Sequence, residues 1–141
     1  MRLPGGVTVV DDAYNSNPSA LQGALAVVAG ERRCVRRIAV LGEMLELGEQ
    51  SVALHDACGR AAAASGLSLL LTVGGAPARA MGRAAVAAGM PGTAVRHAAS
   101  SEEAADMAGA EVRAGDLVLV KGSRGVATER VVERLVSLFE V

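Results

Sequence analysis

The sequence predicts an α/β domain in which helices cover both faces of a mostly parallel β-sheet. Short apolar runs alternate with amphipathic stretches along the 141 residues, which is typical of repeated strand–helix units. The runs at 38–41, 67–73 and 117–120 are almost continuously apolar, as expected for strands buried on both faces. No repeat, linker or low-complexity segment divides the chain, so we expect one domain with one core.

Local signals place the elements in chain order. The expected strands cover residues 7–10, 38–41, 67–73, 93–97 and 117–120, and the expected helices cover 17–30, 49–65, 76–88, 102–112 and a last segment ending near 139. Asn17-Pro18 is a typical helix start, because Asn caps well and Pro suits the first helical position. Ser100 and Glu103 have the spacing of a capping box. Gly30 is a plausible end of the first helix, and Gly66 and Gly89 follow two others, where glycine is common.

The connections between these elements predict where a ligand would bind. Right-handed crossovers bring the carboxyl ends of parallel strands to one edge of the sheet, and ligands of open α/β sheets bind outside that edge. Glycine-containing loops follow the strands that end at Leu41, Val73 and Val120. The direction of the first strand is open, so the sequence does not decide whether Asp11-Asp12 shares this edge.

The composition excludes several classes of protein. The chain is 51% hydrophobic but only 1% aromatic, so Ala, Val and Leu must form the core. A net charge of −1 argues against nucleic-acid binding driven by bulk charge. No apolar run approaches the ~20 residues that span a bilayer, and no signal peptide is visible. Cys34 and Cys58 lack metal-ligand spacing, so we expect a cytoplasmic protein with free thiols and no membrane partner.

Two polar stretches are candidates for chemistry. Residues 11–18 read Asp-Asp-Ala-Tyr-Asn-Ser-Asn-Pro; the two carboxylates are consistent with a general base, a metal site or a ribose-hydroxyl acceptor, and equally with an Asx-turn. Residues 121–125 read Lys-Gly-Ser-Arg-Gly between a strand and a helix, which favours an anion site, although a basic loop that is merely solvated remains the alternative. This loop is not a P-loop, and no dinucleotide fingerprint is present.

Other features support structural interpretations. Gly74-Gly75 is expected to be a turn. His55 lies on a helix and is expected to be a packed or capping residue. The apolar loop from Gly42 to Gly48 either folds onto the core or contacts another domain, and we favour the first.

Three motifs in order resemble the C-terminal domain of the Mur ligases. They are residues 11–18, the segment Ile-Ala-Val-Leu-Gly-Glu-Met-Leu-Glu-Leu-Gly from Ile38, and Leu-Val-Lys-Gly-Ser-Arg-Gly from Leu119. The resemblance covers essentially the whole chain and implies a Rossmann-like three-layer sandwich with a mostly parallel sheet of about six strands and helices on both faces. Ala13, Ser16 and Glu43 depart from the family, which usually has a small hydroxyl residue, Ala and Asp there.

The resemblance is strongest to members that use ATP to add D-alanyl-D-alanine to UDP-N-acetylmuramoyl-tripeptide, through an acyl phosphate, in peptidoglycan precursor synthesis. In such an enzyme the first domain binds the UDP-sugar, and the central domain carries the P-loop, the Mg²⁺ ligands and a carbamylated catalytic lysine. Residues 1–141 would be the third domain, a lid that closes over ATP. The resemblance therefore implies no catalytic residue and no metal ligand in this chain, which alone would be inactive.

The family motifs also imply site residues. Those expected to bind ATP are Arg2, Asp12, Tyr14 and Asn15, with Asp12 accepting hydrogen bonds from the ribose hydroxyls. Those expected near D-alanyl-D-alanine are Lys121, Ser123 and Arg124. Two alternatives remain open: a stand-alone nucleotide- or anion-binding module that regulates a partner, and the equivalent domain of a cyanophycin- or folylpolyglutamate-type ligase. The Lys-Gly-Ser-Arg loop favours the D-alanyl-D-alanine enzyme over these relatives.

Overall fold

A computed structural model describes residues 1–13 and 16–140 and confirms the α/β fold. Within these residues one sheet has six strands in the order β1-β2-β6-β3-β4-β5. The strands are β1 (Arg2–Leu3), β2 (Val7–Asp12), β3 (Arg37–Gly42), β4 (Leu69–Val73), β5 (Val95–Ala98) and β6 (Leu117–Lys121). All neighbouring strands are parallel except β1, which runs antiparallel to β2. The sheet is therefore mostly parallel, as the sequence predicts.

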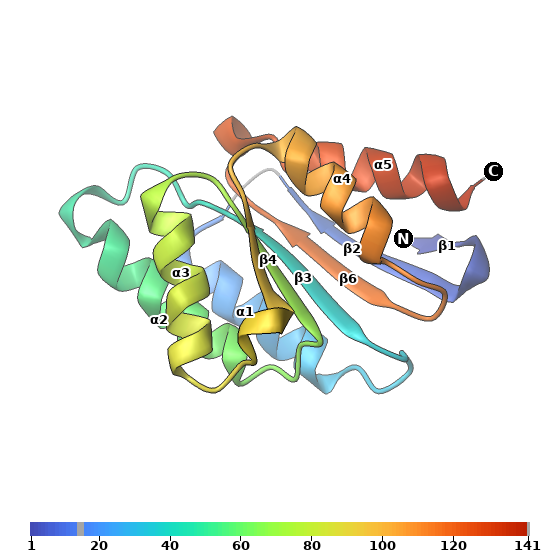
Figure 1. Ribbon diagram of the computed structural model, residues 1–141, viewed down its shortest axis with the longest axis horizontal. Coiled ribbons are helices and arrows are strands. Elements are labelled where there is room, and N and C mark those ends of the chain that lie inside the picture. Colours follow the sequence, from blue (N-terminus) through green and yellow to red (C-terminus); the bar gives the residue numbers. More distant parts are fainter. Residues whose placement is uncertain (14–15, 141) are drawn as a thin grey trace.

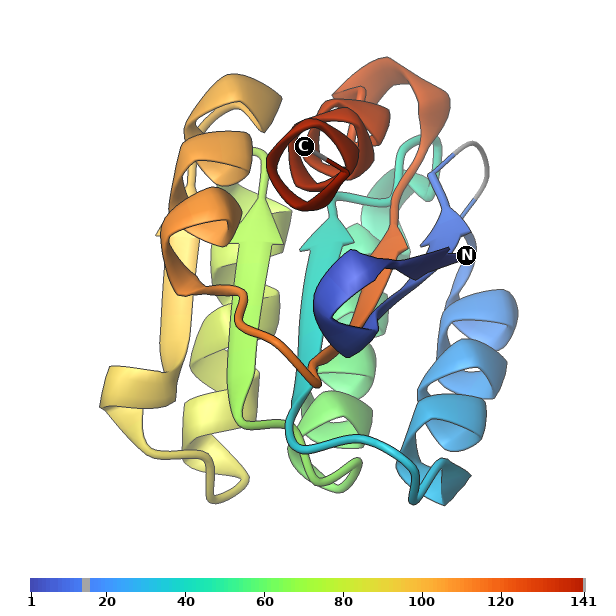
Figure 2. The ribbon, with the colours of Figure 1, turned by 90° about the vertical axis from the view of Figure 1, so that its right-hand side faces the viewer.

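Helices cover both faces of the sheet and complete three layers (Figures 1 and 2). The helices are α1 (Pro18–Gly30), α2 (Ser51–Ala63), α3 (Ala76–Ala87), α4 (Ser101–Glu111) and α5 (Glu129–Phe139). Buried residues of α1, α2 and α3 form one core with one face of the sheet, and those of α4 and α5 form another core with the opposite face.

Alternate residues of each central strand face the two cores. Leu70 packs towards α1, α2 and α3, whereas Leu71 packs towards α4 and α5. Both are at most 1% exposed, which explains why these strands are apolar without alternation. Cys58 on α2 is fully buried in this small-residue packing, as expected of a cysteine that behaves as a small hydrophobe.

The N-terminal region differs most from the sequence prediction. β1 is only two residues long and follows no local pattern, because it exists through its pairing with β2. Between the two strands, Gly5 and Gly6 adopt positive φ angles of 82° and 78°, which glycine tolerates. β2 continues two residues beyond Val10 because its pairing with β6 runs through Asp12. Asp11 and Asp12 thus end a strand rather than form a turn.

The parallel pairing of β2 with β6 decides the question that the sequence leaves open. Asp12 lies opposite Lys121 in the register, so the first strand runs in the same direction as the central ones. The arrowheads of β2, β6, β3 and β4 point the same way in Figure 2. Asp12 and the glycine-containing loops therefore share the carboxyl edge, where ligands of such sheets bind.

Helix α1 begins at Pro18, and Asn17 caps its N-terminus. The side-chain oxygen of Asn17 accepts a hydrogen bond of 2.9 Å from the Ala20 amide. Asn17→Ala should lower the free energy of unfolding by ~1 kcal/mol, because it leaves a helical N–H without its acceptor. Asn17→Ser keeps an acceptor and is the control. Urea denaturation measures both; equal stability of the alanine variant and the parent would exclude a capping role.

The Gly42–Gly48 loop is anchored to the core by Met44, whereas Leu45 is 39% exposed. Met44 is 1% exposed, and its amide donates to His55 Nε2 over 2.9 Å. His55 Nδ1 lies 2.7 Å from the Ser51 carbonyl, so a neutral ring protonated at Nδ1 satisfies both nitrogens. His55 is fully buried and serves the packed structural role expected for it.

Candidate functional site

Asp12 and Lys121 form an ion pair at the carboxyl edge, between strands that are far apart in sequence. The Lys121 ammonium contacts the Asp12 carboxylate, and the Gly122 amide donates to the Asp12 carbonyl over 3.4 Å. The Lys121 side chain is 2% exposed, whereas that of Asp12 is 48% exposed. The pair therefore joins a buried cation to an acidic side chain at the surface, and about half of the Asp12 side-chain surface remains exposed.

The loop that follows Lys121 packs closely against the loop that follows β3. An added Cβ on Gly122 would lie 2.7 Å from Thr128 Oγ1, and one on Gly42 would lie 3.3 Å from the Gly122 Cα. Only glycine allows these two loops to approach so closely. Ser123 Oγ accepts a hydrogen bond of 3.1 Å from the Leu45 amide, which joins the loops a second time. The backbone of Arg124 begins a short 3₁₀ turn, Arg124–Val126.

Glu43 links the β3 loop to the Gly74-Gly75 turn. The Gly75 amide donates to Glu43 Oε1 over 2.8 Å, and the Glu43 amide donates to the Val73 carbonyl over 2.8 Å. Gly74 has a φ of 136°, and its added Cβ would lie 2.8 Å from the Glu43 Cβ. Gly74-Gly75 is the turn that the sequence predicts, and it also lets Glu43 reach across the edge.

A cavity of about 630 Å³ opens beside these loops. Its walls come from the Gly74-Gly75 turn, the first turn of α4 and residues 125–127. Arg79 and Arg130 contribute cations, and Arg130 pairs with Glu102 over 2.7 Å. Within the described residues, Arg79 has no carboxylate partner. The start of α4 adds the positive end of a helix dipole, which Glu102 and Glu103 in its first turn partly offset. Arg79 is therefore the cation that best suits a small molecule with a carboxylate or phosphate.

Strained and unsatisfied groups gather in the same two loops. Glu46 and Ala127 adopt positive φ angles of 64° and 59°, which cost about 1–2 kcal/mol each for residues with a Cβ. The hydroxyl of Thr128 is buried and lacks a hydrogen-bond partner within the described part of the chain. Such features persist where the surrounding structure imposes them, and they are common at functional sites.

The structure brings some of the expected site residues together and separates others. Asp12, Lys121 and Ser123 lie at the carboxyl edge. Arg2 lies opposite Thr8 in the β1–β2 register. Thr8 precedes Asp12 by four residues, which places Arg2 and Asp12 roughly 13 Å apart along the strand direction at ~3.3 Å per residue. Arg2 is exposed on the edge strand and does not meet Asp12. Tyr14 and Asn15 lie outside the described residues, as does the side chain of Arg124.

The positions of Arg79 and Arg130 in the cavity and the linking role of Glu43 are not predicted from the sequence. Arg79 and Arg130 lie in the first turns of helices α3 and α5, so the only signal for them was a cation soon after a strand's carboxyl end. Among the residues that the structure describes, no group of three or more His, Cys, Asp or Glu side chains could hold a metal ion. Nor do residues 1–13 and 16–140 contain a helix with the length and apolarity needed to cross a membrane.

Known proteins resemble this chain over most of its length. Residues 1–124 match the family model described as "Mur ligase, glutamate ligase domain". The UDP-N-acetylmuramoyl-tripeptide–D-alanyl-D-alanine ligase of Mycobacterium leprae is 40% identical over 93% of this chain and 28% of its own length. The same ligase of Mycobacterium bovis is 42% identical over 94% of this chain and 29% of its own length. The chain thus spans less than a third of these relatives.

Solved structures agree with the sequence comparisons. The MurF ligase of Thermotoga maritima, in complex with ADP, superimposes with a TM-score of 0.78 and 29% identity over 99% of this chain and 30% of that protein. MurF of Acinetobacter baumannii superimposes with a TM-score of 0.77 over the whole of this chain and 30% of that protein, at 24% identity, which supports the fold.

Proposed function

This chain belongs to the Mur ligase family, and we propose that residues 1–141 are the C-terminal domain of an ATP-dependent ligase that adds D-alanyl-D-alanine to UDP-N-acetylmuramoyl-tripeptide. The observation that carries the proposal is the 40% identity to a D-alanyl-D-alanine ligase across 93% of the chain. Peptidoglycan precursor synthesis in the cytoplasm is the corresponding role. The domain closes over ATP and positions the dipeptide, and other domains supply the UDP-sugar site and the P-loop.

Asp12 is the residue proposed to recognise the nucleotide. It ends a strand at the carboxyl edge, its side chain is 48% exposed, and its carboxylate contacts Lys121. A carboxylate fixed in this way can accept hydrogen bonds from two vicinal ribose hydroxyls. Arg2, Tyr14 and Asn15 are proposed to contact ATP from the same end of the chain, with Arg2 acting from the edge strand. The ADP complex of the Thermotoga maritima relative is consistent with use of a nucleotide.

The 630 Å³ cavity is proposed to receive D-alanyl-D-alanine. Its Arg79 guanidinium and the start of α4 suit the terminal carboxylate of the dipeptide. Ser123 and Arg124 belong to the loop that continues into the cavity wall at Gly125. The burial of Lys121 supports an indirect contribution to this site, through anchoring the first residue of the loop, whereas direct contact with the dipeptide stays a prediction.

The reaction assigned to the whole enzyme needs ATP and Mg²⁺. The described residues offer no cluster of metal ligands, so we assign the metal to the central domain, where the P-loop would bind the phosphates. The Mg²⁺ would neutralise charge on the transferred phosphoryl group. The residues of this chain would bind the ribose, orient the dipeptide amine and exclude water on closure.

Joining assays on the ligase that contains this chain test the proposal. Phosphate release from ATP is measured with UDP-N-acetylmuramoyl-tripeptide and one of several amines: D-alanyl-D-alanine, D-alanine or L-glutamate. We expect release and amide formation only with the dipeptide. Preference for glutamate would instead indicate a folylpolyglutamate-type ligase. Micromolar binding of ATP by residues 1–141 alone, without joining activity in any longer protein, would favour a regulatory module.

Arg79→Gln tests the dipeptide cavity in the same enzyme. Loss of one charge-assisted hydrogen bond of ~1.5–3 kcal/mol should raise the KM for D-alanyl-D-alanine about tenfold or more, with little change in the KM for ATP. Arg113→Gln is the matched control, because Arg113 is an exposed arginine that lines none of the cavities described above. Equal increases in both KM values for Arg79→Gln would contradict a specific dipeptide role.

A further inference from the structure

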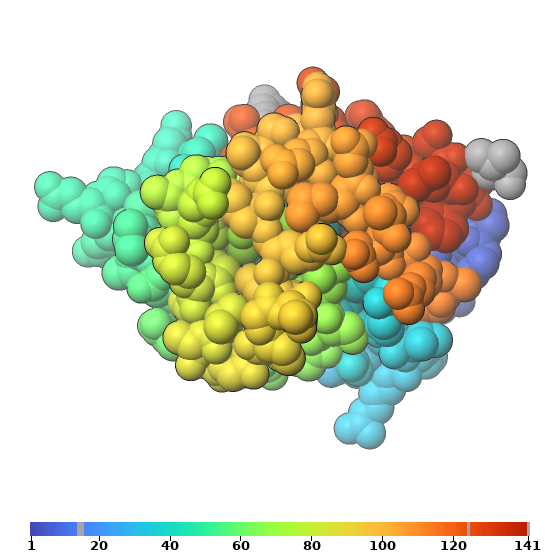
Figure 3. Space-filling view, in the orientation of Figure 1, coloured from blue at the N-terminus to red at the C-terminus, as the bar shows by residue number. Residues whose placement is uncertain are grey.

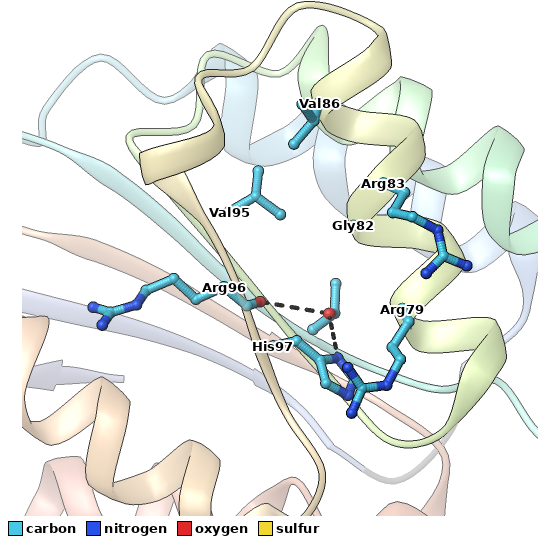
Figure 4. A pocket seen from close by; sticks show the side chains of 8 residues that line it. Arg79, Gly82, Arg83, Val86, Val95, Arg96 and His97 are labelled. Atoms are coloured by element: carbon cyan, nitrogen blue, oxygen red, sulfur yellow. Dashed lines mark hydrogen bonds between the residues drawn. The ribbon is translucent and has the colours of Figure 1, made fainter.

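A second cavity, of about 330 Å³, lies between α3 and the edge strand β5 (Figure 4). The chain from α3 through β5 to α4, coloured yellow-green to orange, covers this side of the molecule in Figure 3. Two valines, three arginines, a threonine, a histidine and a glycine line it; they are Val86, Val95, Arg79, Arg83, Arg96, Thr72, His97 and Gly82. No acidic residue lines it, so its walls are cationic and partly apolar.

His97 carries the chemistry of this cavity. Its Nδ1 lies 2.9 Å from Thr72 Oγ1, and Thr72 is fully buried. His97 Nε2 is also shielded from solvent, yet it has no hydrogen-bond partner among the described residues. A buried polar atom without a partner is uncommon and requires an explanation, and a ligand that bonds to Nε2 provides one.

The contacts of Thr72 allow Nε2 to become a donor. At present the Thr72 hydroxyl can donate to the Arg96 carbonyl only over 3.5 Å, at the limit of a hydrogen bond. If the hydroxyl donates to His97 Nδ1 instead, the ring carries its proton on Nε2. Little is lost in this exchange, because the bond given up is long and weak. The imidazole can therefore present an N–H to an acceptor in the cavity.

Arg79 provides the matching charge. Its side chain extends from α3 towards the His97 ring in Figure 4, whereas the side chain of Arg96 points away on the other side of β5. Arg96 pairs with Glu111 over 2.6 Å. Neither Arg79 nor Arg83 has a carboxylate partner in residues 1–13 and 16–140. Two unneutralised guanidinium groups beside a potential N–H donor are typical of an anion site.

We propose that the α3–β5 cavity is a second ligand site, which binds a small organic anion through His97 Nε2–H and the Arg79 guanidinium. Arg83 adds charge at the rim, and Val86 and Val95 contact the apolar part of the ligand. The volume lies at the lower end of the range for small-molecule pockets, so the ligand is compact. Phosphate monoesters and carboxylates share the required anionic oxygens. This site lies outside the proposed function, and Arg79 is the one residue that it shares with the proposed dipeptide cavity.

The charges around His97 predict how its pKa changes when the cavity is filled. Burial, and then the charge of Arg79, lowers the pKa of His97 from its ordinary value. The Gly74 backbone, which lies near the ring without hydrogen-bond geometry at Nε2, and Glu103 of α4 act in the opposite direction. The lowered pKa favours the neutral ring. An anion on Nε2 offsets the charge of Arg79, so the pKa of His97 should rise when the site is filled. The sign is opposite for a cation, which would lower that pKa further.

NMR titration of the 141-residue chain tests the site with two probes, inorganic phosphate and succinate. We expect saturable millimolar binding of at least one probe, with shifts of the His97 ring and the methyl groups of Val86 and Val95, and a rise in the pKa of His97. His97, Val86 and Val95 line neither the cavity at the carboxyl edge nor the groove between α2 and α3, whereas Arg79 also lines the first and Arg83 the second. Binding of phosphate alone would indicate a phosphate ester, and binding of succinate alone a carboxylate.

Two conservative variants and one control decide the result. His97→Phe keeps a ring but removes Nε2, and Thr72→Val keeps the shape but removes the hydroxyl; each should weaken binding about tenfold. Arg96→Gln is the control: it also removes one positive charge, but the Arg96 side chain points away from the cavity, so binding should be unchanged. Absence of saturable shifts with both probes would overturn the proposal. So would an equal loss in Arg96→Gln, which would indicate attraction by overall charge, or retained affinity in Thr72→Val and His97→Phe.

Discussion

Replacing Asp12 with alanine in the proposed ligase should raise the KM for ATP tenfold or more. The carboxylate would accept hydrogen bonds from ribose hydroxyls, and bonds to a charged group contribute ~1.5–3 kcal/mol. The KM for D-alanyl-D-alanine should change much less, because the dipeptide cavity is formed by other loops. Steady-state kinetics with each substrate varied in turn measures the difference. An unchanged KM for ATP would contradict the ribose role.

The ion pair with Lys121 requires a control, because Asp12→Ala also removes the carboxylate that contacts the buried Lys121 ammonium. Removal of one member of a fully buried pair costs ~3–5 kcal/mol, and the half-exposed Asp12 side chain reduces that figure. A double-mutant cycle with Asp12→Asn and Lys121→Met separates the two effects. If Lys121 positions Asp12, Lys121→Met alone should raise the KM for ATP and add nothing to Asp12→Asn. Independent, additive effects would show that Lys121 acts elsewhere.

Local signals explain which parts of the fold the sequence predicts well. The Asn17 cap, the Ser100–Glu103 capping box and the apolar runs of β3, β4 and β6 each act within a few residues. All five helices that the structure describes lie in the expected segments, with ends shifted by at most two residues, as is usual for helix boundaries. The mostly parallel sheet follows from the alternation of strands and helices.

Pairings between distant segments explain what the sequence does not predict. β6, the last strand in the chain, lies between β2 and β3, and no local pattern specifies that position. Its place joins Lys121 to Asp12 across 109 residues. The sequence therefore predicts two separate sites for these residues, whereas the structure connects them. β1 is likewise defined only by its partner strand.

Cavities are predicted least well, because they depend on side chains from several elements. Gly74-Gly75 is correctly predicted as a turn, but the space beside it exists only because α4 and residues 125–127 approach from elsewhere in the chain. His97 offers no motif, and it meets Thr72 only because the two residues are paired in the register between β4 and β5. Positions of this kind require the tertiary structure.

Gly59→Ala should cause the largest loss of stability of the changes considered for this chain, about 3 kcal/mol. An added Cβ on Gly59 of α2 would lie 2.1 Å from the Met81 carbonyl oxygen and 2.9 Å from the Ala84 Cβ. Both atoms belong to α3, and the first is backbone, so the helices must separate. Overpacking of a well-packed core typically costs ~1–3 kcal/mol, and a clash with backbone falls at the upper end. Urea denaturation at fixed temperature measures the change.

Gly23→Ala is the matched control, because it makes the same substitution inside helix α1. No heavy atom lies within 4 Å of the added Cβ there, so the better helix propensity of alanine should stabilise the chain by ~0.5–1 kcal/mol. Opposite signs for one chemical change would isolate the close approach of α2 and α3 as the cause. Because α3 carries Arg79 into both cavities, partial unfolding of this pair should also weaken ligand binding. A Gly59→Ala variant as stable as the parent would show that the helices can move apart without loss.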